Sequence, residues 1–121
     1  MTVKEFEDLV AVSLDGLPEA FARAMDNVEV IVEIWPTADD LAAGGVPPGS
    51  TLFGLYRGIP QTKRANYQGA LPDKIIIFAG PIVRLFGNNP DAVKKQVRDT
   101  VLHEIGHHFG MSDEEIRAAG K

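Results

Sequence analysis

The segment from His103 to Asp113 holds the residues of this chain best suited to chemistry. It has the form H-E-x-x-H-x-x-G-x-x-D, with His103, Glu104, His107, Gly110 and Asp113 at the fixed positions. On a helix, residues four apart lie on the same face, so His103 and His107 can bind one metal ion together. Glu104 is close enough to take a proton from a water on that metal without being a ligand itself. The pattern therefore predicts a metal site with a base beside it.

The third ligand follows from the turn after this helix. Gly110 can adopt the left-handed conformation that ends a helix, and the reversed chain then returns Asp113 to the two histidines. Three protein ligands and an open position for water are typical of a catalytic zinc site. Cysteine is absent, so any metal must be bound through nitrogen and oxygen. We predict Zn²⁺ on His103, His107 and Asp113, Glu104 as the catalytic base, and hydrolysis of peptide bonds in a peptide or protein substrate.

Asp113 also has a purely structural interpretation. Ser112 and Glu115 form the pattern of a capping box at the start of a helix. An aspartate in the first turn of that helix is favoured by the helix dipole whether or not a metal is present. Glu114 and Glu115 therefore remain alternative ligands, although the spacing favours Asp113.

His108 and three other residues have open roles around this motif. His108 follows Glu104 by four residues and shares its side of the helix, so it is not counted as a ligand. It is either a partly exposed supporting residue or a partner that alters the basicity of Glu104. A peptidase also needs a donor to the oxyanion of the transition state. Tyr56, Arg57, Tyr67 and His108 are the candidates, and the sequence does not choose among them.

Composition limits the classes of function. The 121 residues predict a single domain spanning residues 1–121, and 45% hydrophobic with 24% charged residues is ordinary for a globular protein. The net charge of −5 argues against a nucleic-acid-binding surface. No apolar run approaches the roughly 18 residues that span a bilayer, and the N-terminus mixes acids into what an export signal would keep apolar. We therefore expect a cytoplasmic protein without a membrane segment.

The remaining pattern predicts an α+β fold with a small three-stranded sheet. Alternation and β-branched residues indicate strands, and apolar residues at helical spacing indicate helices. The strand over 51–56 is a candidate edge for pairing with an extended peptide. The most apolar strand, 74–79, is expected at the centre. Helices are predicted over 3–14, 18–25 and 90–109, short helical turns over 37–41 and 82–86, and strands over 28–35, 51–56 and 74–79.

The helix over 90–109 carries the motif. Asn89 and Pro90 are typical of a helix start. Its apolar stripe predicts that it packs against the sheet, with the histidines on its flank; the stripe comprises Val93, Val97, Val101, Leu102, Ile105 and Phe109. An N-terminal helix, started by Thr2, is expected to pack against the same sheet.

These motifs resemble the small bacterial zincin-like metallopeptidase family with the H-E-x-x-H-x-x-G-x-x-D motif. The likeness is specific over Val97–Asp113 and weaker over Leu52–Pro60 and Leu71–Phe78. It implies a compact zincin-like α+β fold, zinc on the two histidines and aspartate of the motif, and its glutamate as the catalytic carboxylate. The motif is also similar to that of metzincins, which have a methionine-containing turn downstream; the eight residues after Asp113 contain no methionine. Met111 lies inside the motif, where a core role is expected.

Two other functions share parts of this pattern. Endoribonucleases of the rRNA-maturation type resemble the chain in having two histidines four apart and a third ligand six residues further on. They carry histidine as the third ligand and lack the glutamate, whereas Glu104 is present here. A catalytically silent module that binds zinc or a partner is the other alternative, but a structural site has no need of a base beside its ligands.

Overall fold

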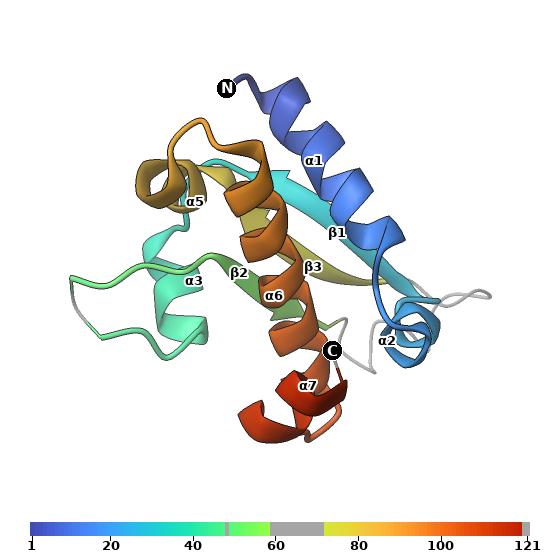
Figure 1. Ribbon diagram of the computed structural model, residues 1–121. Coiled ribbons are helices and arrows are strands. Elements are labelled where there is room, and N and C mark those ends of the chain that lie inside the picture. Colours follow the sequence, from blue (N-terminus) through green and yellow to red (C-terminus); the bar gives the residue numbers. More distant parts are fainter. Residues whose placement is uncertain (48, 59–71, 120–121) are drawn as a thin grey trace.

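A three-stranded sheet and one long helix organise the chain (Figure 1). The computed structural model describes residues 1–47, 49–58 and 72–119. The strand order is β1-β3-β2. The central strand β3 (Asp73–Phe78) pairs in parallel with β1 (Val28–Glu33) and antiparallel with β2 (Gly54–Arg57). The α+β prediction and the central place of the most apolar strand are therefore confirmed.

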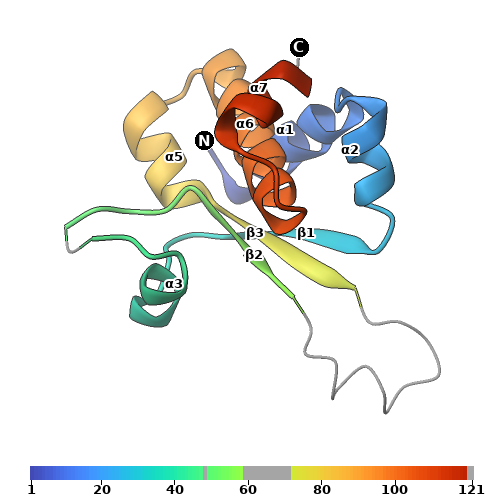
Figure 2. The same ribbon diagram turned by 90° about the horizontal axis from the view of Figure 1, so that it is seen from below.

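The helices are divided unequally between the two faces of the sheet (Figure 2). One face carries the long helix and its neighbours, and α3 (Ala38–Ala43) is the one described helix on the other face. The helices on the crowded side are α1 (Val3–Asp15), α2 (Glu19–Ala24), α5 (Ala79–Phe86), α6 (Pro90–His108) and α7 (Asp113–Ala119).

The main core lies between the sheet and α6. Ile75 and Ile77 of β3 point into it and are fully buried. The α6 residues of this core are those of the predicted apolar stripe except Phe109, which is exposed: Val93, Val97, Val101, Leu102 and Ile105. A smaller cluster on the α3 side contains Leu55, Ile76 and Phe78. Alternate residues of β3 thus serve opposite faces of the sheet.

Local capping signals hold the helices as predicted. The Thr2 hydroxyl accepts a hydrogen bond from the Glu5 N–H at 3.1 Å, and the Asn89 side chain accepts from the Ala92 N–H at 3.2 Å. The Ser13 hydroxyl also donates to the Lys94 carbonyl at 3.2 Å, which joins α1 to α6. These contacts fix the N-terminal helix beside the motif helix.

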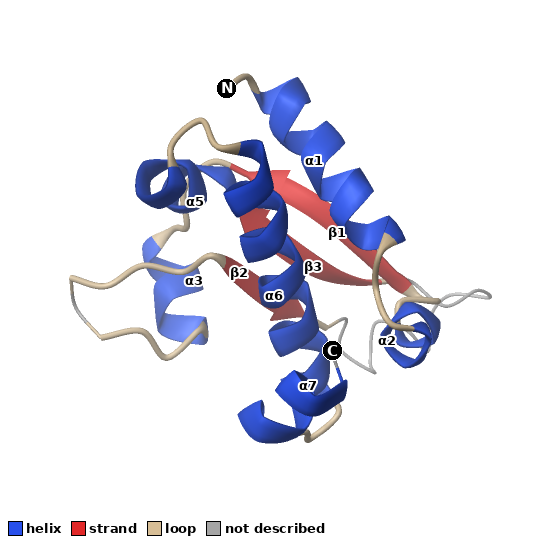
Figure 3. Ribbon diagram, in the orientation of Figure 1, coloured by secondary structure: helices blue, strands red, loops and turns tan. Residues whose placement is uncertain are grey.

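Figure 3 shows the helices, strands and loops of the structure. The boundaries of two strands differ from the prediction. The predicted strands over 28–35 and 51–56 run over 28–33 and 54–57. Helix α5 begins at Ala79, directly after β3, and the pairing of β1 with β3 ends at Phe78. Beyond it the Gly80 N–H still donates to the Ile34 carbonyl at 2.7 Å. The Phe78 N–H still donates to the Phe53 carbonyl, but no strand in the described part of the chain lies opposite Thr51 and Leu52.

The short helices differ by a few residues. Helix α3 runs over 38–43, two residues past the predicted end, and α5 begins three residues before its predicted start. Pro18 caps α2 from outside instead of occupying its first turn. Within the three described ranges, none of the helices has the length and apolar character needed to cross a membrane.

Candidate metal centre

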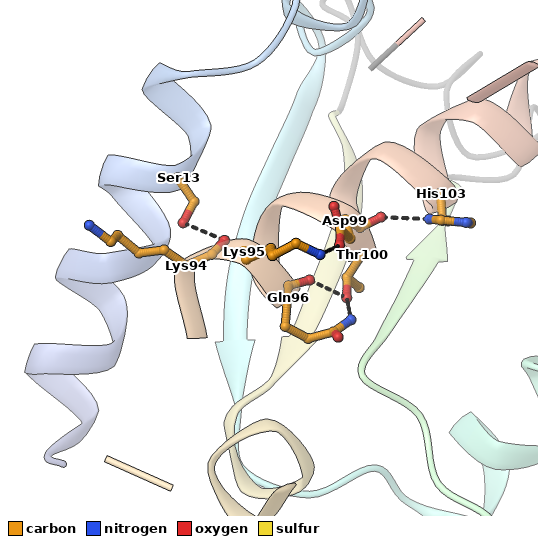
Figure 4. A network of polar contacts seen from close by, with 7 residues as sticks. All are labelled: Ser13, Lys94, Lys95, Gln96, Asp99, Thr100 and His103. Atoms are coloured by element: carbon orange, nitrogen blue, oxygen red, sulfur yellow. Dashed lines mark hydrogen bonds and ion pairs between the residues drawn. The ribbon is translucent and has the colours of Figure 1, made fainter. Parts of the chain in front are cut away.

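The two histidines of the motif lie at the exposed end of α6. Their rings are 5.8 Å apart between centroids and nearly perpendicular. Figure 4 shows the Nδ1 atom of His103 against the carbonyl of Asp99, at 2.8 Å. A carbonyl can only accept, so Nδ1 carries the proton and Nε2 keeps its lone pair in the neutral ring. This arrangement is how proteins orient a metal-binding histidine.

A tight turn after α6 reverses the chain, as the glycine in the motif predicted. Gly110 has φ of +79°, in the left-handed region. The Gly110 N–H donates to the His107 carbonyl at 3.0 Å, and the Met111 N–H donates to the Gly106 carbonyl at 2.8 Å. This pair of bonds defines a Schellman motif, which satisfies the last carbonyls of α6 and sends the chain back along the helix.

Helix α7 docks on α6 through a glycine whose role the sequence analysis missed. Ile116 is fully buried against Gly106, where a Cβ atom would lie 2.4 Å from the isoleucine Cγ1. Gly106 occupies a variable position of the motif. The one sequence signal for its role in helix packing is its small size between Ile105 and His107. The predicted capping box forms as well, with Ser112 and Glu115 exchanging hydrogen bonds of 3.2 and 3.3 Å.

This docking brings Asp113 to the histidines. Its Oδ1 atom lies 2.7 Å from Nε2 of His107 and 3.8 Å from Nε2 of His103. The hydrogen bond from His107 holds the pKa of Asp113 below its usual value. Glu115, an alternative ligand, accepts the Ser112 N–H instead. The structure therefore gathers the three predicted ligands at one place.

The three side chains are close to a zinc arrangement without adopting it. Tetrahedral zinc with bonds of about 2.0–2.1 Å separates its ligand atoms by about 3.3 Å. The distance from Asp113 to His103 is longer than that value, and the distance to His107 is shorter. The shorter distance is that of a direct hydrogen bond between His107 and Asp113. Within the part of the chain that the structure describes, no three His, Asp or Glu side chains have the spacing of a metal site. The donor set of two imidazole nitrogens and one carboxylate fits zinc, and binding requires the His107–Asp113 contact to open by about half an ångström.

Glu104 is held beside these residues by the edge of the sheet. Its Oε1 atom accepts the backbone N–H of Tyr56 in β2 at 2.9 Å. That N–H points away from β3 because Tyr56 and Ile75 form a non-hydrogen-bonded pair of the ladder. Burial raises the pKa of Glu104, against the opposing effects of the Tyr56 N–H and the two histidines. A half-buried carboxylate with one fixed donor and a raised pKa suits a general base.

The other residues named from the sequence take different places. The His108 ring stacks on the Tyr56 ring, 4.0 Å apart with 14° between their planes. In the described part of the chain no hydrogen bond or ion pair joins His108 to Glu104. The Tyr56 hydroxyl donates to Asp73 at 2.6 Å, and Arg57 pairs with Asp40 on the α3 side. Tyr67 lies outside the described residues.

A groove of about 410 Å³ leads into this site between α6 and the segment before β2. Figure 4 shows Gln96, Thr100 and His103 along one side of α6, with Gln96 donating to Thr100 at 3.0 Å. Helix and strand come so close that a Cβ atom at Gly54 would lie 2.4 Å from Cγ2 of Thr100. The groove is lined by Thr51, Leu52, Phe53, Gly54, Gln96, Asp99, Thr100, His103 and Glu104.

A family model of zincin-like metallopeptidases matches residues 25–121, which is most of the chain. The chain belongs to the zincin-like metallopeptidase family. This membership confirms the predicted family, and it carries the general expectation of zinc binding and hydrolysis. No curated protein matches the chain. Among solved structures, a conserved hypothetical protein from Thermus thermophilus is similar, with 26% identity and a TM-score of 0.56 over 89% of this chain and 94% of that chain.

Proposed function

We propose that this chain is a zinc-dependent peptidase in which Glu104 is the general base and acid. The observation that carries the proposal is the position of Glu104. Its carboxylate lies at the edge of β2 on the wall of an open groove. His103 directly precedes Glu104 in α6, and His107 follows it by three residues. The raised pKa of Glu104 suits a group that must both accept and return a proton.

The proposed reaction assigns one task to each side chain. His103, His107 and Asp113 hold the zinc, which when bound polarises the scissile carbonyl and acidifies a water molecule. Glu104 accepts a proton from the attacking water as its oxygen bonds to the carbonyl carbon. Glu104 then gives that proton to the leaving nitrogen as the carbon–nitrogen bond breaks. The products are a carboxylic acid and an amine, and the enzyme is regenerated.

The edge of β2 supports an extended peptide as the substrate. The ladder directs the N–H and C=O of Gly54 away from β3, on the side of the groove. Outward backbone groups at a sheet edge can pair with an added strand, which recognises a polypeptide by its main chain. The net charge of −5 makes RNA a poor alternative.

Metal content is the first test. Elemental analysis of the purified chain should give about one zinc per molecule, and Asp113→Ala should weaken zinc binding by about 100-fold or more through loss of a ligand. Glu114→Ala, the neighbouring exposed acid, is the matched control and should bind zinc normally. Failure of the wild-type chain to bind zinc at neutral pH would overturn the proposal.

Activity is the second test. Zinc-loaded protein is incubated with a proteome-derived peptide library, and new termini are identified by mass spectrometry. Cleavage by the wild type that Glu104→Gln abolishes supports the peptidase. Zinc binding without any cleavage would identify a silent zinc module, and salt-dependent RNA binding would favour a nuclease.

A further inference from the structure

A second hollow continues the groove away from the metal centre. It has a volume of about 570 Å³ and lies beside the start of the segment that leads into β2. The two hollows share Thr51 and Phe53 as wall residues, so they adjoin each other along this segment. Figures 1 and 2 show this segment passing between α3 and α5 on its way to β2.

The second hollow has a distinct chemistry. Trp35 and Leu85 are large apolar side chains with 52% and 64% of their surface exposed. The indole ring of Trp35 is fixed against the start of α5, because a Cβ atom at Gly80 would lie 2.6 Å from it. The surface therefore offers an aromatic ring packed on the backbone of α5 next to an exposed aliphatic side chain.

Arg84 adds a positive charge to this apolar surface. It is exposed, and it is the single charged residue among the described residues that line the second hollow. In the described part of the chain it makes no ion pair. An unpaired arginine beside an aromatic ring is suited to binding a carboxylate next to an apolar side chain.

We infer that Trp35, Arg84 and Leu85 form a remote subsite for the polypeptide substrate. This inference rests on the proposed peptidase function. The occupant is an extended stretch of the substrate in which an apolar residue is followed by an acidic one. The apolar side chain packs on Trp35 and Leu85, and the carboxylate pairs with Arg84.

The distance along the groove fixes where this pair stands in the substrate. An extended chain advances about 3.3 Å per residue. The four residues 51–54 line the groove that contains His103 and Glu104, and Thr51 and Phe53 also line the second hollow. An extended substrate beside this segment therefore reaches from the groove to the second hollow with about four residues. The apolar–acidic pair of the substrate therefore lies about four residues from the scissile bond.

Trp35 itself provides a direct measurement, because it is the only tryptophan of the chain. The experiment titrates the zinc-loaded Glu104→Gln protein with two probe peptides, acetyl-Ala-Ser-Ala-Ala-Leu-Glu-amide and its counterpart ending in Leu-Lys. We expect a saturable change of tryptophan fluorescence with the acidic peptide and weaker binding of the basic one. Equal responses to the two peptides, or no response, would overturn the inference.

A matched pair of variants tests the role of the arginine. Arg84→Ala should weaken the acidic peptide by about five-fold, the effect of one partly exposed ion pair, and should remove the preference over the basic peptide. Arg23→Ala, another exposed arginine on a different helix, should leave both affinities unchanged. An unchanged preference in Arg84→Ala would contradict the subsite.

The fluorescence readout is independent of turnover, so the two proposals can fail separately. Saturable, charge-selective binding at Trp35 without library cleavage would support the surface and refute the peptidase. Library cleavage with no enrichment of an apolar–acidic pair about four residues from the scissile bond, together with equal peptide affinities, would support the peptidase and refute the subsite.

Discussion

Two adjacent residues of β2 contact carboxylates on opposite sides of the sheet, and the two carboxylates differ in nearly every respect. Arg57 pairs with Asp40 on the sparsely covered α3 side, whereas the Tyr56 N–H holds Glu104 on the α6 side. Asp40 is buried and also accepts the Thr37 N–H at 2.9 Å. That bond, with Arg57, holds the pKa of Asp40 below its usual value, while burial raises the pKa of Glu104.

The difference separates a structural carboxylate from one suited to chemistry. Asp40 has a backbone donor and a charged donor, and with Thr37 it forms a complete capping box at the start of α3. Protonating it would break contacts that hold α3 to the sheet. Glu104 has one fixed donor and one oxygen that no donor occupies among the described residues. It can therefore exchange a proton without disturbing the fold.

The largest expected effect is on turnover. Glu104→Gln should lower the cleavage rate by roughly 10²–10⁴-fold, the usual contribution of general acid–base catalysis, while zinc binding is retained. Single-turnover assays with excess enzyme, alongside metal analysis, measure both. Asp40→Asn is the contrasting variant and should keep its rate constant at a temperature where it is folded. Equal loss of rate in the two variants would erase the distinction between the carboxylates.

The free energy of unfolding should fall more in Asp40→Asn than in Glu104→Gln, the reverse of their effects on turnover. Asp40→Asn should lower the free energy of unfolding by about 2 kcal/mol, because it leaves Arg57 without its charged partner and weakens the α3 cap. Glu104→Gln should cost little, since the amide oxygen can still accept the Tyr56 N–H. Urea denaturation of the metal-free proteins gives both values. A Glu104→Gln variant that is the less stable of the two would contradict the comparison.

The contact between α7 and α6 positions Asp113 and has no counterpart at Asp40. Gly106→Ala places a methyl group against Ile116 and should cost about 1–2 kcal/mol of stability, with weaker zinc binding because Asp113 moves with α7. Gly16→Ala is the control, because its Cβ atom would have no neighbour closer than 3.9 Å. Thermal unfolding and a zinc titration on both variants measure the effect. Unchanged zinc affinity in Gly106→Ala would show that α7 docking does not position the third ligand.

The smallest effects concern pH, and they have opposite signs. The pKa of Asp40 is lowered on folding, so its contribution to stability is present above its unfolded value near 3.9 and is lost as pH falls through the folded value. The pKa of Glu104 is raised on folding. Its ionisation therefore costs stability as pH rises from its unfolded value near 4.3 through the folded one.

Metal-free unfolding measured from pH 3 to pH 7, roughly spanning these carboxyl values, tests both signs. The deficit of Asp40→Asn relative to wild type should shrink toward low pH. The advantage of Glu104→Gln over wild type should grow toward neutral pH, by on the order of 1 kcal/mol at most. Parallel pH profiles for the two variants would mean that the two environments are electrostatically alike.

The sequence predicted best what is determined locally. The capping of α1 and α6, the glycine turn and the Ser112–Glu115 box each depend on residues a few positions apart, and each is present. The separation of the histidines from the apolar stripe follows from helical periodicity alone. The motif therefore located the candidate ligands before any tertiary contact was known.

What the sequence could not supply depends on distant partners. The ends of β1 and β2 are set by the start of α5, a property of the sheet and of neither strand. Glu104 and the Tyr56 N–H are 48 residues apart in the chain, and Arg57 pairs with Asp40, which is 17 residues away. Local sequence patterns do not predict such contacts, because residues far apart in the chain meet only once the chain has folded around its core.

The placement of Asp113 on α7 has a consequence for how the protein responds to its surroundings. A helix of seven residues is too short to be stable alone, so α7 depends on the Ile116 contact and on whatever binds Asp113. If zinc binds only when α7 is docked, the free energy of zinc binding also stabilises the docked state of α7. The fraction of molecules with α7 docked would then depend on the concentration of free zinc. Hydrogen exchange of the α7 amides would report how fully the metal site is occupied.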